Sequence, residues 1–140
     1  MKKILLIVCF ILLLSCIQVL ALNSYDRYGN RTGSYRSNSR GVTTQYDKYG
    51  NKVGSYRTNN SGTNAYDKYG NKTGSYKTNS GGVTTQYDKY GNKVRSFKTN
   101  SNGVTIQYDK YGNKTGSYKT DSNGKVTTYD KYGNKTGSFR

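Results

Sequence analysis

The chain of 140 residues carries 23 Lys and Arg against seven acidic residues, a formal net charge of +16, and it has no His, Pro or Trp. Both of its cysteines, Cys9 and Cys16, lie in the first 16 residues. The remainder of the chain therefore lacks the side chains of Ser–His and Cys–His nucleophile pairs and of the usual zinc sites. We predict a protein that is not an enzyme and that uses no cofactor or metal.

Residues 1–21 differ in kind from the rest of the chain. Two lysines precede an almost wholly apolar run from residue 4 to residue 14, and residues 19–21 (V-L-A) suit a signal peptidase. This pattern is typical of a secretory signal and is short for a membrane span. We expect cleavage after this triplet and a protein that is secreted or held in the cell envelope. Two alternatives stay open: a retained N-terminal anchor, and lipidation of Cys16, because residues 13–16 (L-L-S-C) resemble a bacterial lipobox.

Residues 22–140 form a single repeat domain. The element Y-D-K/R-Y-G-N-K/R occurs six times, and successive starts are 21, 20, 21, 21 and 21 residues apart. So regular a period indicates one small structural unit copied along the chain. The units begin at Tyr25, Tyr46, Tyr66, Tyr87, Tyr108 and Tyr129.

Each unit predicts a β-hairpin. Runs of Val, Thr, Gln and Tyr are strand signals, Gly and Asn clusters interrupt them, and no helical apolar period follows residue 21. In D-K-Y-G the Asp suits the first position of a type I turn and the Gly suits the left-handed position after it, giving a three-residue loop with a bulge. A second turn, which also ends in Gly, joins each unit to the next. The one shorter spacing falls in this second turn, near residues 59–64.

The fold class follows from the need to cover an apolar face. Aliphatic residues are scarce after residue 21, so the 16 tyrosines have to supply the core, each burying about 150–250 Å². We expect an all-β array of about six hairpins that closes into a flower-like ring or barrel, because the strand at Leu22 is free to pair with the last strand. An open meander or solenoid is one alternative. A disordered low-complexity state is another, since positive charge is high and aliphatic content low.

Strand alternation gives a specific prediction for the core. If Asp109 faces Asn113 across the loop, the pairs Tyr108–Lys114, Ile106–Gly116 and Val104–Tyr118 share one face. The first Tyr of each unit is then a core residue, and Thr105, Gln107, Ser117 and Lys119 take the opposite face.

Departures from the repeat carry predictions of their own. A column of glycines in the second strands would leave room for tyrosine rings from the next strand. Arg95 replaces this Gly in the fourth unit and should distort it. Val126 is one residue out of phase with Val104, so the last unit should pack differently. The glycine column consists of Gly33, Gly54, Gly74, Gly116 and Gly137.

The turn tips are the candidate functional residues. The second Tyr of each unit lies in the predicted loop beside a Lys or Arg. Aromatic rings stack on sugars or bases, and the cations meet phosphate, sulfate or carboxylate. The alternative is that these tyrosines pack on neighbours while the cations keep the array soluble. The candidate rim consists of Tyr28, Tyr49, Tyr69, Tyr90, Tyr111 and Tyr132 with Arg27, Lys48, Lys68, Lys89, Lys110 and Lys131.

The segment Y-D-K-Y-G-N-K-V-G at residues 46–54 resembles the short repeats of small secreted bacterial β-flower proteins. The resemblance implies a ring of hairpins with a D-x-x-G turn and a second Gly four residues on. The Y-D-x-x-G-N portion is also similar to the tyrosine–aspartate (YD) repeats of Rhs and teneurin-type shells, which lack that second Gly. Cell-wall-binding aromatic hairpins are a weaker analogy, because their tryptophans are missing here.

We therefore expect a secreted or surface-attached protein that binds anionic polymers, such as lipopolysaccharide, teichoic acid or an acidic glycan, through the rim. The alternative from another class is a structural or adhesive matrix protein that associates with itself through tyrosine. Basic charge interleaved with Tyr also fits nucleic-acid binding. The signal segment argues against a cytosolic target and leaves extracellular nucleic acid only.

Overall fold

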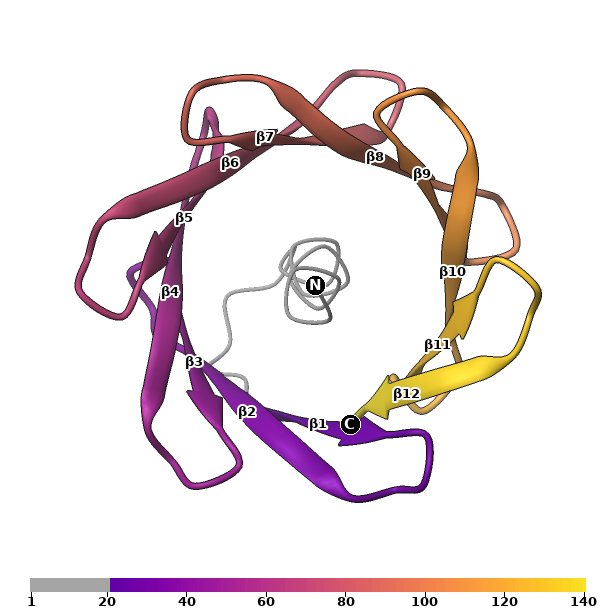
Figure 1. The fold of residues 1–140 in the computed structure, drawn as a ribbon, viewed down its shortest axis with the longest axis horizontal. Helices are drawn as coiled ribbons and strands as arrows, with labels where there is room; N and C mark the ends of the chain where they lie inside the picture. The colour runs from indigo at the N-terminus through magenta and orange to yellow at the C-terminus, as the bar shows by residue number, and fades with distance from the viewer. Residues whose placement is uncertain (1–20) are drawn as a thin grey trace.

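The computed structural model describes residues 21–140. Residues 1–20 of the expected signal, which spans residues 1–21, lie outside the described residues, and so does Cys16. Twelve strands, each antiparallel to its neighbours, form a closed barrel in which the last strand pairs with the first (Figure 1). This confirms the predicted all-β ring of hairpins. The strands are β1 (Ala21–Asp26), β2 (Arg31–Ser37), β3 (Val42–Asp47), β4 (Lys52–Asn59), β5 (Gly62–Asp67), β6 (Lys72–Thr78), β7 (Val83–Asp88), β8 (Lys93–Thr99), β9 (Val104–Asp109), β10 (Lys114–Thr120), β11 (Val126–Asp130) and β12 (Lys135–Phe139).

The ring closes between its first and last strands. Ser24 lies opposite Phe139, and the main chains of Asn23 and Arg140 exchange hydrogen bonds of 2.8 and 3.1 Å. Closure removes both free sheet edges, which would otherwise invite pairing with other chains. Within residues 21–140 no helix is long and apolar enough to cross a membrane.

The two kinds of turn share one geometry. At the tip of the fifth hairpin Asp109 N donates to Asn113 O at 2.9 Å and Gly112 N to Asp109 O at 3.2 Å, with φ of +94° at Gly112. At the second turn Asn100 N bonds Val104 O in the same way. Both are therefore three-residue loops that need Gly at the left-handed position. The shorter spacing does fall in a second turn, where β4 and β5 pair directly from Asn59 to Gly62.

A β-bulge in every hairpin overturns the predicted pairing. Tyr108 does pair with Lys114, but Thr115 is an extra residue, so that Gly116 then meets Gln107 and Tyr118 meets Thr105. The same shift recurs in the other five hairpins. Since a bulge of one residue moves all later side chains to the other face, the predicted apolar face was wrong.

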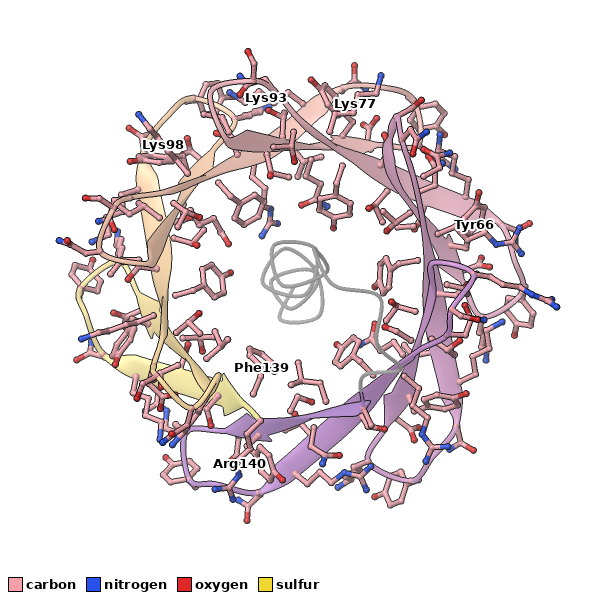
Figure 2. All side chains as sticks on the ribbon, turned by 180° about the vertical axis from the view of Figure 1, so that it is seen from behind. Tyr66, Lys77, Lys93, Lys98, Phe139 and Arg140 are labelled. Atoms are coloured by element: carbon pink, nitrogen blue, oxygen red, sulfur yellow. The ribbon has the colours of Figure 1, made fainter. Side chains whose placement is uncertain are left out.

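The core is consequently built by the third aromatic residue of each unit and not by the first. Tyr118 is 1% exposed, whereas Tyr108 is half-buried on the outer wall. Figure 2 shows Phe139 inside the ring and Tyr66, Lys77, Lys93 and Lys98 outside it. The inward aromatic residues are Tyr35, Tyr56, Tyr76, Phe97, Tyr118 and Phe139.

The bulge has a physical reason that is visible in the sequence. Lys114 and Lys119 are five residues apart, and in a regular strand residues at an odd spacing lie on opposite faces. The extra residue at Thr115 lets both lysines point to the outer wall, where both are exposed. Five of the even-numbered strands carry two cations at this spacing, and in the sixth the second cation, Arg140, follows β12 directly. A regular strand would therefore have turned one cation of each unit toward the inside of the barrel.

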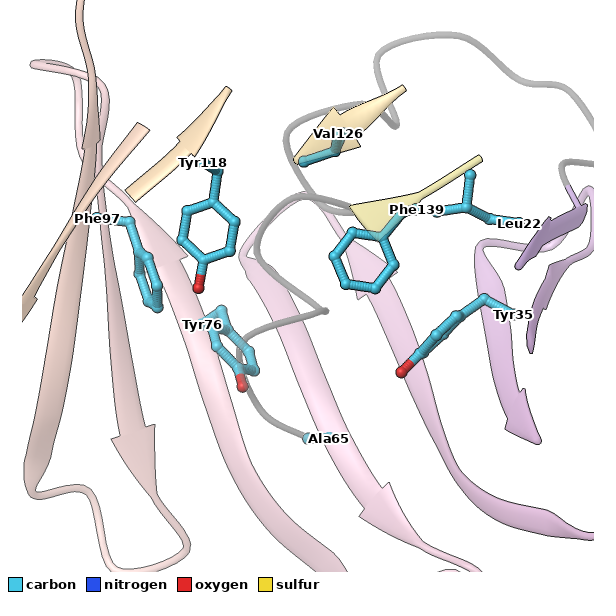
Figure 3. Packing of buried hydrophobic residues seen from close by; sticks show 8 residues of the cluster. All are labelled: Leu22, Tyr35, Ala65, Tyr76, Phe97, Tyr118, Val126 and Phe139. Carbon is cyan, nitrogen blue, oxygen red and sulfur yellow. The ribbon is translucent and has the colours of Figure 1, made fainter. Parts of the chain in front are cut away.

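The inner wall is partly polar. Thr or Ser hydroxyls pair across adjacent strands, as between Thr99 and Thr105 at 2.8 Å, and Tyr118 Oη donates to Gln107 Oε1 at 2.9 Å. Phe97 packs beside Tyr118 with ring centroids 6.5 Å apart (Figure 3). Hydrogen bonds of this kind remove most of the cost of burying polar groups.

The glycine column faces inward, but it makes room for backbone and not for rings. A Cβ at Gly116 would stand 2.7 Å from Tyr129 O on the next strand. Arg95 nevertheless keeps the register of its unit, pairing with Gln86 and Asp109 as the glycines do in theirs, so the predicted distortion of the pairing is absent. Val126 is buried inside while Val104 lies on the outer wall, as its offset predicted.

Candidate functional site: the tip rim

The six D-K/R-Y-G tips lie at one end of the barrel. Each tip joins an odd-numbered strand to the following even-numbered one, and in an antiparallel ring all such connections emerge at the same end. The remaining five turns lie at the opposite end. We call the twelve predicted Tyr, Lys and Arg residues of the six tips the tip rim.

The Asp of each tip is fully engaged in holding its turn. Asp47 Oδ1 accepts hydrogen bonds from Tyr49 N and Asn51 N, both at 2.9 Å, and Oδ2 accepts from Asn51 Nδ2 at 3.1 Å. These bonds, those from Asn51 first, lower the pKa of the Asp47 carboxyl. The same set of three bonds occurs at Asp26, Asp67, Asp88, Asp109 and Asp130.

The tyrosine of each tip is the exposed large hydrophobic residue of its unit. The six are 77 to 81% exposed, and they are the exposed large hydrophobic residues of the described chain. In five tips the preceding lysine lies over the ring, with Lys48 Nζ 4.8 Å from the centroid of Tyr49 and the others at 4.8 or 4.9 Å. In the first tip Arg27 lies 5.8 Å above Tyr28. Each tip thus presents an aromatic face and a cation as one unit.

The tip cations have no carboxylate partner. Among residues 21–140 no ion pair joins any of them to an Asp, because the tip carboxylates point into their own turns. Two of the 23 Lys and Arg precede residue 21, so 21 cations stand against seven Asp in residues 22–140, a net charge of +14. This excess charge is available to an external anion.

A groove of about 680 Å³ lies between the second and third tips. It is lined by Asp47, Asn51 and Lys52 of the second hairpin and by Lys68 and Tyr69 of the third. It arises because the strands are staggered, so that Asp67 lies level with Gly54 of the preceding hairpin. A cation of one unit therefore lies beside the aromatic–cationic pair of the next.

All twelve predicted rim residues therefore lie on the turns where they were expected, and the ring gathers them at one end. Sequence reasoning missed a second set of cation–aromatic pairs on the outer wall. Arg36 lies 5.5 Å above Tyr46 and Arg57 lies 5.2 Å above Tyr66. Each arginine belongs to the strand before its tyrosine, so the correct strand register was needed to find them.

The opposite end differs in chemistry. Where the tips carry Lys and Tyr, its turns carry Asn, Ser or Gly, except that the first of them carries Arg40. Asn100 Oδ1 accepts the turn hydrogen bonds there from Asn102 N and Val104 N. Within residues 21–140 no three His, Cys, Asp or Glu side chains come together in a way that could hold a metal ion. No protein-family model and no curated protein matches the chain.

Proposed function

We propose that this chain is a non-enzymatic binding protein whose tip rim takes anionic polymers, such as an acidic glycan, lipopolysaccharide or teichoic acid. The observation that carries the proposal is the set of six exposed Tyr–cation pairs, which stand at one end of a closed ring without carboxylate partners. A sugar ring would stack on tyrosine while its anionic group meets the cation.

The repetition supports a polymer in preference to a small ligand. One exposed pair contributes little free energy alone, but six linked sites raise the effective concentration of each repeat unit of a polymer for the next site. The groove between the second and third tips gives the polymer a path from one Tyr–cation pair to the next.

The test is salt-dependent retention on immobilised heparin, a sulfated glycan, using a variant with all six rim cations changed to Ser. The matched control removes the same charge from the outer wall. We expect the natural chain and the control to elute above physiological salt and the rim variant at or below it, because site-specific contacts and not net charge hold the polymer. The control changes Arg36, Arg57, Lys77, Lys98, Lys119 and Arg140 to Ser; all six are exposed.

Equal loss of retention in the two variants would show that net charge alone attracts the polymer, and the tip rim would then have no special role. A further variant with the six rim tyrosines changed to Ser separates stacking from charge. It keeps every cation, so an unchanged elution position would remove the aromatic part of the proposal.

A second function is favoured by the same exposed tyrosines, namely a structural or adhesive protein that associates with itself. Six phenol rings that are at least 77% exposed are accessible to another chain and to oxidative coupling. Sedimentation at high concentration and dityrosine fluorescence after oxidation test this alternative. A monomer without that fluorescence would contradict it.

We also propose that the protein acts outside the cell, secreted or in the envelope, on the support of the signal pattern in residues 1–21, and that it is related to the β-flower proteins whose repeats it resembles. Mass spectrometry of the processed N-terminus distinguishes cleavage before Leu22 from lipidated Cys16.

An extracellular nucleic acid is a less favoured partner. Displacement of the protein from immobilised heparin by DNA measures whether it binds.

A further inference from the structure

The inner wall departs from the repeat at one place. Tyr76, Gln86 and Arg95 are consecutive register partners on β6, β7 and β8, so their side chains form a row across three neighbouring strands. All three face inward, because Tyr76 and Gln86 are 2 and 7% exposed and Arg95 lies two residues before the buried Phe97. In the other five units a glycine takes the position of Arg95.

Gln86 has a buried oxygen without a donor. In the second and fifth units, the Gln at this position accepts a hydrogen bond from the tyrosine eleven residues later. Tyr56 Oη donates to Gln45 Oε1 at 3.1 Å and Tyr118 Oη to Gln107 Oε1 at 2.9 Å. In the fourth unit, the residue eleven positions after Gln86 is Phe97, which has no hydroxyl. Gln86 Oε1 is left with no hydrogen-bond partner, which is costly for a buried acceptor.

Arg95 brings an uncompensated cation to the same row. Asp109 is its partner on the other side, but the Asp109 carboxylate is held by Tyr111 N, Asn113 N and Asn113 Nδ2. Within residues 21–140 Arg95 makes no ion pair. Its guanidinium acts on the neighbouring phenol: burial raises the pKa of Tyr76, and the charge of Arg95 partly opposes this shift.

We propose that the row Tyr76–Gln86–Arg95 binds a small organic acid. Its carboxylate pairs with the Arg95 guanidinium, and a hydroxyl or N–H group of the same molecule donates to Gln86 Oε1. This is a site of the inner wall, separate from the tip rim in place and in residues.

The chemistry of the row defines this ligand class. Guanidinium binds a carboxylate with two parallel hydrogen bonds. Gln86 Oε1 is an acceptor, so the ligand also needs a donor. A twelve-stranded barrel is wider than the eight-stranded barrels that side chains just fill. Arg95 is only half-buried, so the ligand reaches its charge first.

A hydroxy acid such as glucuronate has both groups and serves as the probe, with neutral glucose as the matched control. Binding is measured by NMR titration of the full chain, following the side-chain signals of Arg95 Nε–H and the Gln86 amide. We expect saturable shifts at both groups with glucuronate and none with glucose.

The repeat supplies variants that occur at the same positions in other units. Arg95→Gly restores the residue of the other five units, and Gln86→Ala copies Ala65 of the third unit. We expect Arg95→Gly to weaken glucuronate binding at least tenfold and Gln86→Ala to weaken it less, while Lys98→Ser on the outer wall leaves it unchanged. Melting temperatures confirm that each variant is folded.

Two results would overturn the proposal. One is equal glucuronate affinity in the natural chain and in Arg95→Gly. The other is a free-state structure in which Arg95 itself donates to Gln86 Oε1, together with no glucuronate shift at either group. Neither result affects the proposal for the tip rim, whose heparin test involves other residues.

Discussion

The tip rim and the inner wall are built from the same repeat but keep it to different degrees. The tip sequence is the same in all six units except that Arg replaces Lys twice, in the first unit. On the inner wall the position of Gln86 holds Ser, Gln, Ala or Thr in other units, and the aromatic position holds Tyr or Phe. The polar groups of each tip are hydrogen-bonded within that tip, so each unit needs the same residues. The side chains of the inner wall contact those of neighbouring units, so a substitution in one unit is accommodated by side chains of the next.

The two regions also differ in their contribution to stability: the inner wall stabilises the barrel, and the tip rim is presented to the solvent. The aromatic residues of the inner wall are buried and contribute most of the apolar burial. The rim tyrosines are exposed, and their rings lie beside the Lys or Arg of their own tips. Variants of the wall should therefore change stability, and variants of the rim should change binding.

The largest expected effect is unfolding in alkali, which acts on the wall. Burial raises the pKa of Tyr35, Tyr56 and Tyr76, so the unfolded chain loses these protons at lower pH than the folded one. This contribution to stability is complete below the ordinary Tyr pKa of about 10 and falls as pH rises above it. We expect cooperative unfolding in this range, measured by circular dichroism alongside tyrosinate absorbance. Full ionisation of all tyrosines with the strand signal intact would contradict the assignment of the core.

Truncation of one aromatic residue gives the next largest effect. Tyr118→Ala removes a ring that is 1% exposed together with its hydrogen bond to Gln107, and we expect a loss of about 3–5 kcal/mol in the free energy of unfolding. The control is Tyr111→Ala in the same hairpin, whose ring is 78% exposed, with an expected change within about 0.5 kcal/mol. Denaturant titration measures both. Equal losses of unfolding free energy in the two variants would contradict the assignment of stability to the inner wall and not to the tip rim.

Removing a hydroxyl from one inner-wall ring and adding one to another should change the free energy of unfolding in opposite directions. Tyr118→Phe removes the donor to Gln107 Oε1 and should cost about 1 kcal/mol, while Phe97→Tyr offers a donor to Gln86 Oε1 and should gain about as much. Denaturant titration of the two single variants and the double variant gives the comparison. If Phe97→Tyr destabilises the chain, the unpaired oxygen of Gln86 is satisfied in some other way.

The smallest expected effect is loss of stability in acid, which acts on the tips. Turn hydrogen bonds lower the pKa of the tip carboxyls such as Asp47. Their contribution is complete above the ordinary Asp pKa of about 4 and is lost as pH falls below it. Melting temperature against pH measures this. A variant with Asn at all six tip Asp positions should lose the acid dependence, because Asn100 and Asn79 already hold equivalent turns. A persistent acid dependence would place its origin outside the tips.

The sequence by itself determined the local structure. The 21-residue period, the strand and turn signals and the Gly positions all follow from interactions within a few residues, and for this reason the hairpins and the turn containing Asn59 were predicted correctly. The exposure of the tip tyrosines also follows from local structure, since the middle residue of a three-residue loop has few neighbours.

Only the tertiary structure decided which face of the sheet becomes the inside. One extra residue at Thr115 reverses every later side chain, and the spacing of Lys114 and Lys119 was the signal that indicated it. The glycine column likewise proved to accommodate a neighbouring carbonyl. Closure set the pairing of Ser24 with Phe139, and the pairing of neighbouring hairpins placed Tyr76 beside Gln86. Local propensities are equal on the two faces of such a strand; the closed ring fixes which of them is buried.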